Sequence, residues 1–219
     1  MKFPIRTARR DRAVPPGRIP NDIGSSVLLL HTLQAEEAFE ELLSTGRIVP
    51  DPSRADPDFE DAYAWMFRQM EQRLPTRGEG ALWLWAKIRR RDLVSNWCWP
   101  DGNILLTRRV PRERVLLSMY GHWHRVLNAS PNVLPLPGES DDAYGDRLDV
   151  ELDDFFDQVQ AAGVRYDAVS TWPDYLRNEI EASWESIFDP AVSERTSYWQ
   201  ATVHELRVED VVEAVRLQN

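Results

Sequence analysis

The stretch VLLLHTLQAEEAFEELLSTG, residues 27–46, predicts a strand followed directly by a helix. The apolar run over residues 27–31 is typical of a buried strand. After Thr32 as a cap, apolar residues recur at helical spacing, and Gly46 is placed to end the helix in the left-handed conformation. A strand and an amphipathic helix in immediate succession indicate a protein in which helices pack on a sheet.

The rest of the chain switches between helical and strand periodicity. Trp83, Trp85 and Lys87 share one face of an alternating segment, which is strand behaviour. We expect helices at residues 58–74, 151–162, 173–188 and 210–217, strands at residues 82–88, 103–110, 115–119 and 198–208, and a loop at residues 129–150. These elements predict an α+β fold, with a mixed or antiparallel split sheet and packed helices.

Charge is distributed unevenly along the chain. The net charge is -10, but residues 1–22 contain six basic and two acidic residues. We expect residues 1–22 to form a basic flexible tail without structure of its own, and residues 23–219 to fold as a single domain. An acidic body repels phosphates, so nucleic-acid binding by the body is not expected.

Composition excludes several classes of protein. The single cysteine, Cys98, excludes an intramolecular disulfide and any multi-cysteine metal centre. The N-terminal stretch lacks the apolar core of a signal peptide, and no apolar run is long enough to span a bilayer, so we expect a cytoplasmic protein without a membrane partner. No glycine-rich phosphate motif is present, which argues against a Rossmann or P-loop site.

The segment VLLSMYGHWHRVLN, residues 115–128, has the composition of a site, because an apolar run ends in a glycine and a polar, aromatic cluster. On a strand, His122 and His124 would point the same way and could serve a metal-dependent hydrolase; on a helix they would diverge by roughly 200 degrees. The local context favours a strand that ends in a helix. No third ligand lies nearby, so we expect no metal. Instead we expect His124 to hydrogen-bond in the interior, Trp123 to pack, and Asn128 to cap or to bind backbone.

Five ordered blocks of the chain resemble a bacterial family catalogued only as a domain of unknown function. The blocks are YAWM at 63–66 with QM at 69–70, LWLW at 82–85, VLLS at 115–118 with WH at 123–124 and VLN at 126–128, SWESIFD at 183–189, and QAT at 200–202. The chain departs from the family pattern at Met119, where an aspartate is expected, and near Arg91, where a proline is missing. This resemblance names no activity.

The order of elements is also similar to that of bacterial ADP-ribosyltransferases, with a first strand ending in His31, a helix, a glycine and an aromatic middle strand. The resemblance implies an ADP-ribosyltransferase-like sheet and an NAD-utilising transferase or glycohydrolase that binds its nucleotide in a single cleft, with NAD as the substrate. His31 and Gln200 would anchor the ribose, and Glu205 would supply the carboxylate that an amide cannot replace. The other expected ligand-binding residues are Thr32, Gln34, Trp85, Trp123, His124 and Asn128.

A noncatalytic binding or regulatory module is the alternative. In that case the same polar groups are satisfied structurally, and the chain acts through its surface. Trp97 and Trp99, in a polar loop, are then candidates for the mouth of a cleft or for a protein-contact patch, with a partner that the sequence does not specify.

Overall fold

The computed structural model describes residues 3–14, 23–51, 53, 55–94, 103–192 and 198–218. The chain forms two compact units. The first comprises residues 1–54, 66–117 and 197–219, and the second comprises residues 55–65 and 118–196. The expected α+β fold with a mixed sheet is confirmed. The single domain expected over residues 23–219 stays a prediction.

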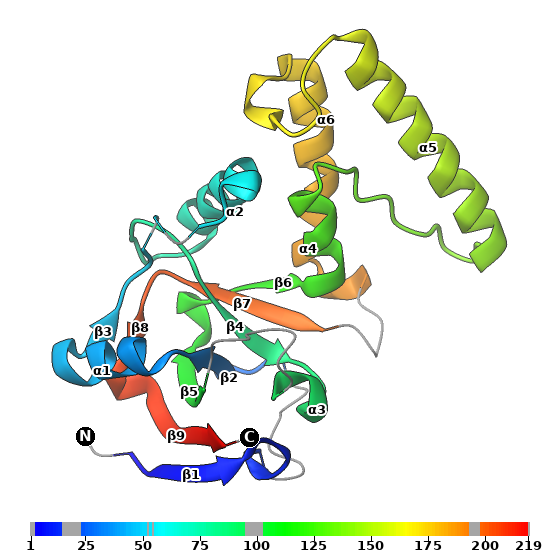
Figure 1. Ribbon diagram of the computed structural model, residues 1–219. Coiled ribbons are helices and arrows are strands. Elements are labelled where there is room, and N and C mark those ends of the chain that lie inside the picture. Colours follow the sequence, from blue (N-terminus) through cyan, green and yellow to red (C-terminus); the bar gives the residue numbers. More distant parts are fainter. Residues whose placement is uncertain are drawn as a thin grey trace. The chain divides into compact units, whose positions relative to one another are not determined.

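A mixed sheet of seven strands dominates the first unit (Figure 1), in the order β1-β9-β5-β2-β4-β7-β6. β1 pairs parallel with β9, and the pairs β9–β5, β5–β2, β2–β4 and β4–β7 are antiparallel. The strands are β1 Ile5–Arg9, β2 Val27–Gln34, β4 Leu82–Lys87, β5 Ile104–Pro111, β6 Leu116–Met119, β7 Trp199–Val203 and β9 Val211–Gln218. β3 Arg47–Ile48 and β8 Leu206–Arg207 form a separate antiparallel pair.

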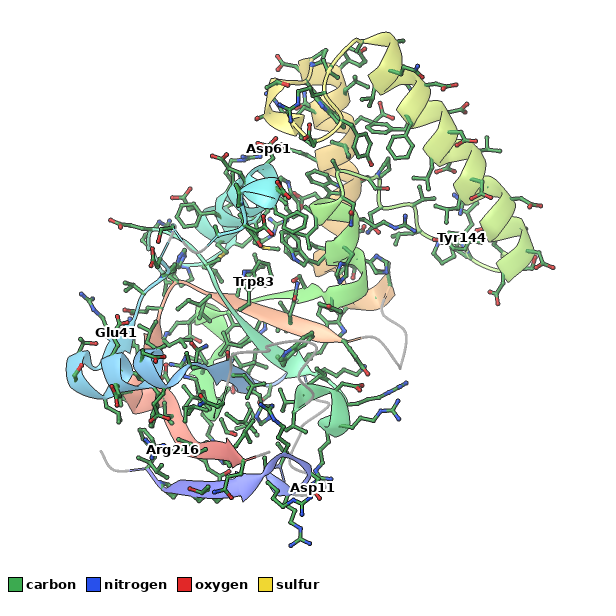
Figure 2. All side chains as sticks on the ribbon, viewed as in Figure 1. Asp11, Glu41, Asp61, Trp83, Tyr144 and Arg216 are labelled. Carbon is green, nitrogen blue, oxygen red and sulfur yellow. The ribbon has the colours of Figure 1, made fainter. Side chains whose placement is uncertain are left out.

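Helix α1, Glu36–Thr45, packs on one face of this sheet. Its buried stripe and its C-terminal end follow from sequence: Phe39 and Leu42 are fully buried, and Gly46, at φ 81°, donates its backbone N–H to the Leu42 carbonyl. Arg216 of β9, labelled in Figure 2, donates to Glu36 at 2.5 Å and lies over the Phe39 ring. The sheet face that carries Arg216 is therefore the face that α1 covers.

The prediction that Thr32 caps this helix was wrong. Thr32 lies inside β2, and Ala35 occupies the cap position. β2 is longer than its apolar run suggests because its backbone pairs with β5 as far as Gln34, which lies opposite Ile104.

Short helical segments and the C-terminal part of α2 complete the first unit. α2, Glu60–Arg73, begins after a 3-10 turn at Pro57–Phe59 and passes from the second unit into the first at Met66. The shorter elements of the first unit are α3 Arg90–Leu93 and the 3-10 turns Arg10–Arg12, Arg112–Arg114 and Val208–Asp210. Met66 and Met70 are fully buried, as the stripe of this helix predicts.

The second unit is helical. It contains α4 Tyr120–Leu127, α5 Asp141–Ala161 and α6 Asp174–Trp184, with 3-10 turns at Val169–Thr171, Glu185–Phe188 and Pro190–Val192. Trp184 is central to its core: the indole N–H donates to the Ser130 carbonyl at 2.8 Å, and the Trp65 ring meets the Trp184 ring edge-on. Phe155 of α5 packs against Trp172.

Three sequence predictions of secondary structure need correction. Residues 141–150, expected as loop, begin α5, because the Ser140 side chain caps the helix by accepting from Ala143 N–H. A helix was expected at residues 210–217, but Val211–Gln218 form β9, whose backbone pairs with β1 and β5. Residues 5–9, inside the expected structureless tail, form β1.

Within the described parts of the chain, none of the helices combines the length and the apolar character that a membrane crossing demands.

Candidate functional site

A row of side chains crosses five strands of the first unit, one residue from each. In register, Glu213 of β9 lies opposite Thr107 of β5, Thr107 opposite His31 of β2, His31 opposite Trp85 of β4, and Trp85 opposite Gln200 of β7. Directly opposed residues of antiparallel strands share one face, with Cβ atoms about 5 Å apart. Three of the predicted site residues, from distant parts of the sequence, thus lie side by side.

His31 is the most deeply buried member of this cross-strand row, with 1% of its surface exposed. Its Nδ1 lies 3.2 Å from the Thr107 hydroxyl, and its Nε2 is buried without a hydrogen-bond partner among the described residues. Burial lowers the pKa of His31 to about 4, against the opposing influence of the Glu213 carboxylate. The ring is therefore neutral at pH 7, with one nitrogen able to donate and the other able to accept.

Gln200 and Trp85 form the other end of the row. Gln200 is 6% exposed, and the described residues offer no hydrogen-bond partner to its buried amide nitrogen. Trp85 is 5% exposed, and Tyr198 meets its ring edge-on at 6.3 Å while donating its hydroxyl proton to Asp92. Burial and this hydrogen bond raise the pKa of Tyr198. Tyr198 therefore occupies one side of the indole.

The separation of His31 from Gln200 suits a small ring. Two strand spacings place their backbones about 10 Å apart, with the Trp85 indole between them. Trp83, labelled in Figure 2, lies two residues before Trp85 and opposite Thr202, so the aromatic surface continues along the same face of β4. The arrangement presents a flat apolar surface between two neutral polar groups.

Thr107 and Glu213 are members of the row that the sequence did not single out. The alternation of residues 103–110 could have placed Thr107 on a strand face, but nothing local indicates that this face meets His31. Glu213 is held by Arg6 of β1, whose Nε lies 2.8 Å from the carboxylate. The carboxylate at this end of the row is thus an ion-paired group.

The structure does not bring every predicted residue of the first unit into the row. Thr32 points to the opposite face of β2, where its hydroxyl donates to the Trp83 carbonyl and accepts from Gln34. Glu205 lies five residues after Gln200, beyond the end of β7, and pairs with Arg207 at 2.5 Å. Neither Glu205 nor the Thr32–Gln34 pair belongs to the row.

Three predicted ligand-binding residues lie in the second unit and make local contacts there. Trp123 is buried and stacks on Tyr63 at 6.4 Å, as expected for a packing residue. Asn128 ends α4 and donates its side-chain amide to the His124 carbonyl at 2.6 Å, as expected for a cap. His124 is exposed, with its ring against Tyr120, so the prediction of an interior hydrogen bond for this residue was wrong.

His122 and His124 do not form a shared metal site. Both lie on α4, where positions two apart point in directions about 200 degrees apart. The expectation of a strand that ends in a helix is confirmed, since α4 begins at Tyr120, directly after β6. Nowhere in the described ranges do three or more histidine, cysteine or acidic residues gather as a metal would require. Trp97, Cys98 and Trp99 lie outside the described residues.

Comparison with known proteins places this chain in a family but assigns no chemistry. Residues 29–212 match the family described as "Domain of unknown function (DUF3841)", so the chain belongs to that family, as its sequence blocks predict. No curated protein and no solved structure matches the chain.

Proposed function

We propose that this protein binds a nucleotide of the NAD type on the face formed by His31, Trp85 and Gln200. The description of its family names no activity, so the proposal depends on the cross-strand row. The row is the observation that carries the proposal. An aromatic or sugar ring can lie against the Trp85 indole, while the imidazole and the carboxamide at its two sides bind ring substituents or ribose hydroxyls.

Two polar atoms without partners support ligand binding. Buried polar atoms are nearly always hydrogen-bonded, since leaving one unsatisfied costs about 1–3 kcal/mol. His31 Nε2 and Gln200 Nε2 lie in one row and have no partner in the described parts of the chain. A ligand that bridges both would satisfy two buried groups at once.

The contacts of Trp85 define what the ligand must displace. The side chains of His31, Trp85 and Gln200 are 1%, 5% and 6% exposed, so a ligand can enter only if the groups that cover them move. Tyr198 is one such group, because its ring lies against the indole. We infer that a ligand ring replaces the Tyr198 ring on Trp85.

The chemistry of the row favours binding over turnover. Cleavage of the bond between nicotinamide and ribose develops positive charge on the sugar, which a nearby carboxylate would stabilise. Gln200 is uncharged, Glu213 is paired with Arg6, and Glu205 is outside the row. We therefore propose a nucleotide-binding or regulatory role first, with ADP-ribosyl transfer or glycohydrolysis and an ADP-ribosyltransferase-like fold as further hypotheses.

Calorimetric titration of the full chain with NAD, ADP-ribose and nicotinamide tests the proposal. Gln200→Leu removes an amide whose nitrogen has no partner, so it should leave the unfolding temperature nearly unchanged while weakening NAD or ADP-ribose binding about tenfold, the effect of about 1.4 kcal/mol. Gln69→Leu is the matched control, since Gln69 is also buried with an unpartnered amide oxygen but lies on α2.

The outcomes separate the hypotheses. Binding that Gln200→Leu weakens and Gln69→Leu preserves supports the site. Absence of binding by all three ligands at millimolar concentration, or equal weakening by both variants, rejects it. Release of nicotinamide from NAD by the wild type would add catalysis to binding.

A further inference from the structure

A small pocket of about 130 Å³ lies in the first unit, away from the cross-strand row, at the turn between β7 and β8. Its walls come from the segment after α2, from the 3-10 turn before β6, and from the turn itself. The lining residues are Thr76, Arg77, Arg114, Val203, His204, Glu205 and Arg207. Its size suits an ion or a group of a few heavy atoms, such as phosphate.

Positive charge exceeds negative charge around this pocket, although the chain as a whole carries a net charge of -10. Three arginines line the pocket, and Glu205 is the one acidic residue among the lining side chains. Asp210, behind Arg114, adds a second negative charge, but the buried Arg108 guanidinium shares that same carboxylate. A concentration of cationic groups around a concave site attracts anions.

The guanidinium groups have donors left after their protein contacts. Arg114 uses its two terminal nitrogens on Asp210, at 3.1 and 2.9 Å, and Arg207 uses Nε and one terminal nitrogen on Glu205. Arg77 donates from one terminal nitrogen to the Leu74 and Thr76 carbonyls. Each guanidinium carries five N–H groups, so all three retain donors for an oxyanion.

Two uncharged lining groups also lack partners. The Thr76 hydroxyl is buried without a hydrogen-bond partner among the described residues, and so is Nε2 of His204, a side chain only 4% exposed. The Gly80 carbonyl lies 3.3 Å from His204 Nδ1 and can only accept, so Nδ1 carries the proton in the neutral ring. Nε2 is then an acceptor, which suits an anion that bears a hydroxyl proton.

We propose that this pocket binds a phosphate group, with hydrogen phosphate as its simplest ligand. The arginines and the Thr76 hydroxyl donate to the phosphate oxygens, and the protonated phosphate oxygen donates to His204 Nε2. Sulfate has the same shape and charge as hydrogen phosphate but has no proton at neutral pH, so it satisfies the arginines and not His204.

Thermal unfolding and calorimetry at constant ionic strength, with sodium phosphate, sodium sulfate and sodium chloride, test this site. Phosphate should raise the unfolding temperature of the full chain and bind more tightly than sulfate, with chloride as the baseline. AMP separates the two sources of phosphate: binding by AMP as tight as that of inorganic phosphate points to a phosphate ester, and weaker binding points to the free ion.

Two variants address the pocket without disturbing its ion pairs. Arg77→Gln removes an exposed arginine, and Thr76→Val replaces an unpartnered hydroxyl by a methyl group of similar size. Each should weaken phosphate binding about tenfold. Arg109→Gln is the control for charge, because Arg109 is exposed on β5 and does not line the pocket.

Two results would overturn the site. One is that Arg109→Gln weakens phosphate binding as much as Arg77→Gln does, and the other is that the wild type binds no phosphate at about 10 mM. This result is separate from the nucleotide proposal. Gln200→Leu should leave phosphate binding intact, and Arg77→Gln should leave NAD binding intact, so either site can fail alone.

Discussion

The carboxylate of Asp210 lies 3.2 Å from the guanidinium of Arg108, a side chain with no exposed surface in the middle of β5. Arg114, whose side chain is 16% exposed, lies 2.9 Å from the same carboxylate. Burial lowers the pKa of Arg108 to about 10 although Asp210 acts in the opposite direction. One carboxylate thus compensates a buried cation and a partly exposed one.

Removing Asp210 should cost more stability than removing Arg108. Asp210→Asn leaves the buried Arg108 charge without its counterion, and we expect a loss of about 3–5 kcal/mol in the free energy of unfolding. Arg108→Met leaves Asp210 paired with Arg114 and fills the same space with apolar atoms, so it should cost clearly less. Urea unfolding of both variants measures the difference. A larger loss for Arg108→Met would contradict this account of the ion pair.

His31 should make the stability of the protein depend on pH. The pKa of His31 is about 4 in the folded state and 6.5 in the unfolded state, so the unfolded state binds more protons between these values. Stability from this residue is therefore full above pH 6.5 and falls as pH decreases toward 4, by about 3 kcal/mol in total. His31→Gln removes the titration. The difference in unfolding free energy between wild type and His31→Gln should be constant above pH 7 and shrink below 6.5; a difference independent of pH would show that His31 does not titrate as argued.

Two glycines should respond in opposite directions to replacement by alanine. Gly46 has φ 81°, a conformation that disfavours any Cβ, so Gly46→Ala should destabilise the protein by about 1 kcal/mol. Gly145 lies inside α5, and a Cβ there meets no atom within 4 Å, so Gly145→Ala should stabilise by about 0.4–1 kcal/mol. Thermal unfolding of the pair reports both signs. Two changes of the same sign would be incompatible with this interpretation.

Two tryptophans of the second unit should differ in their tolerance of phenylalanine. Trp184 donates its indole N–H to the buried Ser130 carbonyl, so Trp184→Phe loses that bond as well as volume. Trp65, in contact with Trp184, has a buried N–H without a partner among the described residues, so Trp65→Phe loses volume but no hydrogen bond. We expect Trp184→Phe to cost about 1–3 kcal/mol more, measured by chemical denaturation. Equal costs would mean that the Ser130 bond contributes little.

Elements that depend on residues close together in the sequence were predicted correctly. The predictions of a helix that ends at Gly46 and of a strand around Trp85 are confirmed, because helix periodicity, strand alternation and capping depend on neighbours in sequence. The prediction of a helix at residues 210–217 was wrong. Val211 to Gln218 become a strand because their backbone groups pair on both sides, with β1 and with β5, and this pairing overrides local preference.

The candidate site shows the same division. The sequence by itself supplied the imidazole of His31, the indole of Trp85 and the carboxamide of Gln200 as chemistry worth following, and it identified the family. Tertiary structure alone decided that these three stand in one cross-strand row, that Glu205 lines another pocket, and that Asp210 serves two arginines. Strand order and register come from hydrogen bonds between segments more than 50 residues apart. The residues next to a side chain in the sequence therefore do not determine which residue lies opposite it.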